Sequence, residues 1–135
     1  MAALVSDRQT PHRASHEFAF PVAAATKIFG GALVCLNSSG YATKGAVSTT
    51  LKCVGIADGL ADNSAGAAGD IKVKTKRGTF KFANSASTDQ ITLADVGASA
   101  YIVDDQTVAK TNGTSTRSIA GTIRDVESDG VWIEI

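Results

Sequence analysis

The chain has 135 residues, a length that suits one domain with an extension. Lysine plus arginine balance aspartate plus glutamate at 13 each, so no net charge steers the protein toward nucleic acid or an anionic membrane. No apolar run approaches the roughly 18 residues of a membrane-spanning helix. These totals exclude a strongly basic nucleic-acid binder and a helical membrane protein.

The large apolar residues are few. Leucine, isoleucine, valine and phenylalanine together number 31, against 22 alanines and 13 glycines. Fully burying one large apolar side chain contributes about 1.5–3 kcal/mol, so the predicted core is small compared with the backbone entropy lost on folding. A small core indicates either modest stability or burial of further surface against copies of the chain or a partner, and we favour the second interpretation.

Residues 1–20 are predicted to form an extended N-terminal arm. They are mostly polar, lack periodicity and begin MAALVSDRQTPHR, with no apolar stretch followed by a cleavage site, so we expect no export signal. Phe18 and Phe20 alternate with Glu17 and Ala19, which is strand-like and puts both rings on one face. Such a segment can add to a sheet edge or fill pockets on a neighbour. The alternative is a terminus folded onto its own domain.

Short β-strands separated by turns are predicted after the arm. Residues 32–36 form a buried strand, closed by the Asn-Ser-Ser-Gly turn at 37–40. Residues 51–57 form a second strand, in which Gly55 indicates a bulge. The long stretch at 58–70 consists of small residues, which is typical of a functional or disordered loop.

Residues 71–84 have the clearest alternation in the sequence. The positions on one predicted strand face are lysines: Lys72, Lys74 and Lys76. Gly78 interrupts the pattern, and Phe80 and Phe82 resume it as inward-facing residues. We therefore expect either one long bent strand or two strands joined at Gly78.

One helical turn and two hairpins are predicted beyond residue 84. Thr92 can cap a short turn that ends at Gly97. The paired hairpin segments are 100–103 with 107–110, and 118–126 with 131–135 around Asp129-Gly130. The whole pattern predicts an all-β fold: a small β-barrel or β-sandwich-like domain over 21–135, with at most one short helix.

The residues that could bind a metal or catalyse a reaction lack the spacing for it. His12, His16, Cys35 and Cys53 are nominally four zinc ligands, but the cysteines are 18 positions apart and the histidines lie in the arm. No nucleophile motif and no glycine-rich phosphate loop occurs. We therefore predict no enzyme activity, no metal, no cofactor and no small-molecule substrate, and expect both cysteines to be buried, reduced thiols.

Basic residues are concentrated in one segment: Lys72, Lys74, Lys76, Arg77 and Lys81. A small barrel with a basic strand could bind single-stranded nucleic acid, but that mode needs aromatic rings on the same face for the bases to stack on. Phe80 and Phe82 are out of phase with Lys81. We expect a solvated face or contact with an acidic protein surface, and nucleic acid is the less favoured alternative.

Four stretches of the sequence match a known protein family at the level of pattern: FPVAAATKIFGGALVCLNSSGYA, RGTFKFAN, AYIVDDQTVAKT and AGTIRDVESDGVWIEI. They resemble the small capsid decoration (cement) proteins of tailed double-stranded-DNA bacteriophages and prophages. The resemblance implies a β-rich domain with an N-terminal arm that binds the major capsid protein on the outside of the head. Such proteins usually form homotrimers at three-fold and quasi-three-fold positions, where they stabilise the expanded shell against the pressure of packaged DNA.

Our hypothesis for the arm is that it reaches over the major capsid protein. We expect Phe18 and Phe20 to anchor it on the capsid, and Arg8 and Arg13 to pair with capsid carboxylates. The protein would be made in the bacterial host cytoplasm and end on the outer capsid surface of the virion. A head-fibre base or another virion component is a further alternative.

Overall fold

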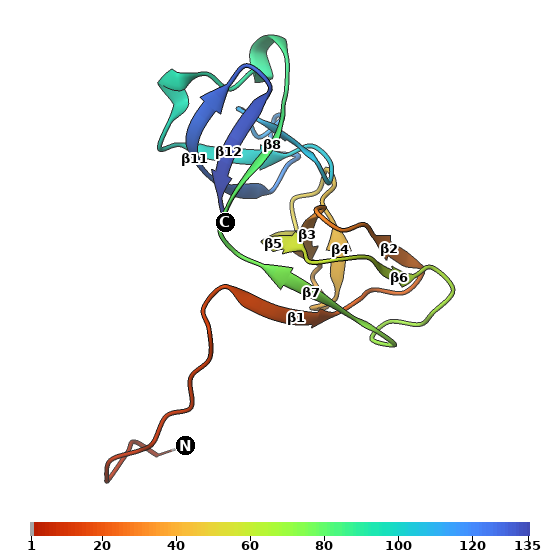
Figure 1. Cartoon of the computed structure of the whole chain (residues 1–135), viewed down its shortest axis with the longest axis vertical. Coiled ribbons are helices and arrows are strands. Elements are labelled where there is room, and N and C mark those ends of the chain that lie inside the picture. Colours follow the sequence, from red (N-terminus) through yellow and green to blue (C-terminus); the bar gives the residue numbers. More distant parts are fainter. Residues whose placement is uncertain (1) are drawn as a thin grey trace.

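Two β-modules stacked along the long axis make up the fold (Figure 1). The computed structural model describes residues 2–135, and within them the chain is all-β, with two single turns of 3-10 helix as its helical elements. The second module is a closed five-stranded barrel. The N-terminal segment extends from the first module on the side away from this barrel. The predicted all-β, barrel-containing fold is confirmed.

The first module is a five-stranded antiparallel sheet in the order β1-β7-β5-β3-β4, joined by the two-stranded ribbon β2-β6. Its strands are β1 (Glu17–Pro21), β2 (Thr26–Ile28), β3 (Leu33–Leu36), β4 (Ala42–Lys44), β5 (Lys52–Ala57), β6 (Ala61–Asn63) and β7 (Lys72–Lys76). The sheet curls until its outer strands meet, because Val22, just beyond β1, forms a parallel bridge to Ala42. The interior is the first core, whose fully buried residues include Val22, Ile28, Val34 and Val73.

The second module closes in the order β10-β8-β12-β11-β9. Its strands are β8 (Thr79–Asn84), β9 (Ser99–Ile102), β10 (Thr107–Ala109), β11 (Ile119–Glu127) and β12 (Gly130–Glu134), with the turns η1 (Ser87–Asp89) and η2 (Leu93–Asp95) between β8 and β9. The barrel core includes Ile102, Val108, Ile123 and Ile133. Both predicted hairpins are present. Thr92 occupies the N-cap position of η2, where its backbone N–H donates to Asp95 Oδ2 at 2.8 Å. The turn η1 was not predicted.

Strand β3 contributes to both cores. Leu33 and Cys35 pack in the barrel core, whereas Val34 between them packs in the first core. This follows from the alternation of side chains along a strand. The Leu33 N–H also donates to the carbonyl of Asp105, in the loop before β10, at 2.8 Å. The two modules are therefore packed against each other through a shared strand.

Two details of the predicted strands are resolved by the pairing. The register of β3 and β5 passes from Val34–Gly55 to Cys35–Cys53, which leaves Val54 without a partner and confirms the bulge. The segment 71–84 is two strands, β7 and β8, on either side of Gly78, and they belong to different modules.

Two expectations need correction. Residues 58–70 are not an open loop, because they contain β6 and the buried side chain of Asn63, whose amide donates to the carbonyls of Ala23 and Ala67 at 2.9 Å each. The free arm is shorter than residues 1–20, because β1 begins at Glu17 and pairs with β7. In both cases the partner lies far along the chain, where local sequence patterns carry no information.

The Gly55→Ala substitution should destabilise the fold strongly. Gly55 has φ of +138°, and a Cβ there would lie 2.2 Å from the carbonyl oxygen of Lys76. We expect a loss of about 3 kcal/mol in the free energy of unfolding, measured by urea denaturation. The control is Gly40→Ala, where φ is +83° and nothing lies within 4 Å of a Cβ, so only the torsional penalty of about 1 kcal/mol applies. Equal losses in the two variants would contradict the steric argument.

Candidate functional site

The arm is the most exposed part of the molecule. Residues 2–17 are all exposed, including the apolar side chains of Leu4 and Val5, which are 72% and 99% exposed. Arg8 and Arg13, the predicted partners of acidic groups, lie in this segment. The arm joins the first module at His16, whose carbonyl accepts a hydrogen bond from the backbone N–H of Arg77 at 2.8 Å. The side chains of residues 2–17 are therefore open to solvent, and Arg13 also contacts the ring of Phe18.

Phe18 and Phe20 pack on the sheet of their own chain. In the register of β1 and β7 they lie opposite Thr75 and Val73, both buried, so their rings share the inner face. The two rings stack with centroids 6.3 Å apart, and the Arg13 guanidinium lies over the Phe18 ring at 5.0 Å. Phe20 packs against the first core. These contacts match the alternative interpretation of residues 17–20 as a terminus folded onto its own domain. Phe18 is only partly buried.

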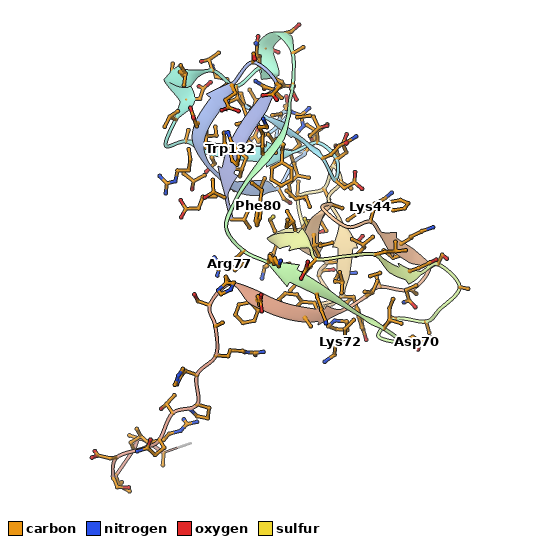
Figure 2. The ribbon with its side chains drawn as sticks, in the orientation of Figure 1. Lys44, Asp70, Lys72, Arg77, Phe80 and Trp132 are labelled. Atoms are coloured by element: carbon orange, nitrogen blue, oxygen red, sulfur yellow. The ribbon has the colours of Figure 1, made fainter. Side chains whose placement is uncertain are left out.

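Lys72 and Lys74 form the basic part of the outer face of β7. The side chains of β7 alternate between exposed lysines and buried Val73 and Thr75, as predicted. The residues of β1 opposite the two lysines are small, Pro21 and Ala19. Neither lysine forms an ion pair within residues 2–135, whereas Lys76 pairs with Asp58 at 3.4 Å. Figure 2 shows Lys72 on the side of the first module away from the barrel, at the other end of β7 from Arg77, where the arm joins the sheet.

The predicted basic cluster is divided between the two modules. Lys81 lies on β8 of the barrel, where its Nζ contacts Glu127 at 3.2 Å and Asp129 at 2.9 Å. The hydrogen bonds to these carboxylates raise the pKa of Lys81. Phe82 is buried and Phe80 packs against the barrel core, as predicted. The free positive charge of this segment is therefore confined to the first module.

Arg77 lines a groove that the sequence did not predict. It lies between β7 and β8, at the junction of the modules (Figure 2), and its side chain is exposed. The groove has a volume of about 420 Å³ and is lined by Phe18, Phe20, Cys53, Val54 and Arg77. It opens because β7 leaves the sheet at Lys76 while β5 continues beside it. The Arg-Gly pair at 77–78 indicates the break in the strand, but no local pattern indicates that β1 and β5 lie beside it.

The first module thus carries the arm, the lysines Lys72 and Lys74 on the outer face of β7 and, at the junction with the barrel, the groove. Within residues 2–135 no group of three or more His, Cys, Asp or Glu side chains is placed to hold a metal ion. In the same residues no helix is long and apolar enough to cross a membrane. Comparisons with protein-family models, curated proteins and solved structures find no match. What this end of the molecule can do chemically is bind through charge, apolar contact and backbone hydrogen bonds.

Phe20 and Phe18 should differ in what they contribute to stability. We expect Phe20→Ala to lower the free energy of unfolding by roughly 2–3 kcal/mol, because this ring packs against the first core. Phe18→Ala should lower it by about 1 kcal/mol, since Phe18 contacts mainly Phe20 and Arg13 at the surface. Chemical denaturation of both variants measures the difference. A larger loss for Phe18→Ala would show that Phe18 is the main attachment of β1.

Proposed function

We propose that this protein is a structural decoration (cement) protein of the head of a tailed double-stranded-DNA bacteriophage or prophage. It binds the major capsid protein on the outer capsid surface as a homotrimer and stabilises the expanded shell, without catalysing a reaction. The observation that carries the proposal is the arm, which is exposed throughout residues 2–17 and is attached to the sheet through β1. The resemblance of four sequence stretches to this class of protein supplies the identity of the partner.

The arm is suited to lie on a larger surface. Its apolar residues Leu4 and Val5 would gain burial against a partner, and Arg8 can pair with a carboxylate there. Arg13 is engaged with Phe18, so it can bind a carboxylate close to the sheet while keeping this contact. Because β1 is part of the sheet, force on the arm is transmitted to the first core through Phe20.

Lys72 and Lys74 extend the same binding face. They are exposed, unpaired within the described residues and flanked by Ala19 and Pro21, so an opposing surface can approach closely. An acidic patch on the capsid would pair with them. Because both lysines are exposed, these pairs contribute up to about 1 kcal/mol each and are weakened by salt.

Association of copies is supported by exposed apolar residues elsewhere in the first module. Ile28 pairs with Ala61, so the next residues, Phe29 and Leu60, lie opposite each other at the end of the β2-β6 ribbon. They are 59% and 61% exposed. A cyclic trimer would bury such a patch on every subunit.

Three arms on one trimer would then bind three lattice sites at once. The second and third contacts are intramolecular, so individually weak contacts give strong overall binding through effective concentration. A protein that binds only the assembled shell stabilises that state by RT ln(1 + [L]/Kd), about 2.7 kcal/mol per site at a hundred-fold excess over Kd. Stabilising the shell in this way requires binding alone and no catalysed reaction.

Removal of residues 2–14 tests the proposal. The deletion leaves His16 and β1 in place, so the fold should be unchanged, which circular dichroism and the melting temperature check. We expect co-sedimentation with expanded phage heads to be lost, because the exposed apolar and basic residues of the arm are gone. The matched control replaces residues 2–14 with a glycine-serine segment of equal length, and it should also fail to bind. Full binding by the truncated, folded protein would reject the arm as the capsid contact.

Charge reversal at Lys72 and Lys74 tests the face beside the arm. The double variant K72E/K74E should bind heads roughly ten-fold more weakly at low salt, from two exposed pairs of up to about 1 kcal/mol each. The difference should shrink as salt is added.

The control for charge reversal is K44E/K52E, which makes the same change in net charge at two other exposed lysines of the first module. It should bind heads like the unmodified protein. Equal weakening of both double variants would mean that net charge, and not this face, governs binding.

A further inference from the structure

The two cysteines face each other across neighbouring strands. Cys35 on β3 and Cys53 on β5 are paired residues in the antiparallel register. Residues directly opposite in such a pair have Cα atoms about 4.5–5.5 Å apart. Disulfides form at Cα separations of about 4.4–6.8 Å. Both thiols are free in this structure, and their pairing in the register is compatible with a disulfide.

The two thiols differ in access. Cys35 is fully buried and belongs to the barrel core. Cys53 is half-buried and lines the groove beside Arg77, where β7 has left the sheet. A reagent in solution therefore reaches Cys53 first, whereas the buried Cys35 thiol contacts that of Cys53 through a hydrogen bond.

The surroundings also favour the thiolate on Cys53. A hydrogen bond from the Cys35 thiol, the backbone N–H of Gly55 and the positive charge of Arg77 lower the pKa of Cys53. The hydrogen bond to Cys53, together with burial, raises the pKa of Cys35 far above its ordinary value. The thiolate is the reactive form of cysteine. The accessible cysteine is thus also the more nucleophilic one.

We propose that Cys53 is a thiol-modification site that reacts with low-molecular-weight disulfides, and that Cys35 resolves the product into a disulfide between β3 and β5. In the first step the Cys53 thiolate attacks one sulfur of oxidised glutathione, forms a mixed disulfide and expels one glutathione thiolate. In the second step Cys35 gives up its proton, attacks the sulfur of Cys53 and expels the second glutathione thiolate. Two protein thiols are oxidised to one disulfide, and one glutathione disulfide is reduced to two thiols.

This inference goes beyond the proposed function, because it requires no capsid. The disulfide would cross-link the two central strands of the first sheet at the point where that sheet also contributes to the barrel core. A cross-link constrains the unfolded chain, so the oxidised protein should melt roughly 10 °C higher than the reduced protein. The structure itself has both cysteines free, Cys35 buried and Cys53 half-buried.

The experiment treats the folded, full-length protein with oxidised glutathione and follows it by intact-mass spectrometry after alkylation of the remaining thiols. The unmodified protein should lose the mass of two hydrogens and retain no thiol that can be alkylated. Cys35→Ser should stop at one glutathione adduct on Cys53. Cys53→Ser should take up no glutathione while folded, because Cys35 is buried, and should react once it is denatured.

Arg77→Gln tests the electrostatic part of the inference. Loss of the positive charge beside Cys53 should slow the first step about three-fold at neutral pH. Lys72→Gln removes a charge elsewhere on the same segment and should leave the rate unchanged. The proposal is overturned if Cys53→Ser reacts as fast as the unmodified protein when folded, or if the unmodified protein stops at the glutathione adduct.

Discussion

Strand β3 is buried on both faces, and the rest of the structure depends on this constraint. Leu33 and Cys35 pack in the barrel core and Val34 packs in the first core, so four residues join two hydrophobic clusters. A chain with few large apolar residues gains from such sharing, because one strand buries both of its faces without needing two separate sheets. The barrel therefore lies on one side of the first sheet, and the opposite end of the molecule is left for the arm.

The two ends of the molecule differ in how fully their polar groups are paired. In the barrel, Lys81, Arg117 and Arg124 each pair with a carboxylate. At the end where β1 and β7 lie, Lys72 and Lys74 have no ion-pair partner within residues 2–135, and the arm is exposed. Charges that are unpaired and apolar residues that are exposed are what a binding surface offers a partner. This asymmetry, rather than any arrangement of reactive groups, is the main argument for a binding function.

Much of the candidate site could be predicted from local patterns. The two-residue period of a strand was enough to place Lys72 and Lys74 on an exposed face and Val73 in the core. Polar composition was enough to predict the exposed arm. The docking of β1 beside β7 could not be predicted, because the partners are more than fifty residues apart, as in the pair of Phe18 with Thr75. The groove at Arg77 was missed for the same reason, since it exists only where three distant segments meet.

The sequence by itself determined the strands with clear alternation, such as β7 and β8, and which side of each is apolar, because these properties depend on neighbours in the chain. It also indicated a bulge at Gly55, where the structure has a φ of +138° that other residues avoid. Only the tertiary structure decided that β7 and β8 belong to different modules and that Cys35 faces Cys53. Strand pairing depends on contacts between distant segments, and alternation in one strand does not specify which other strand will lie beside it.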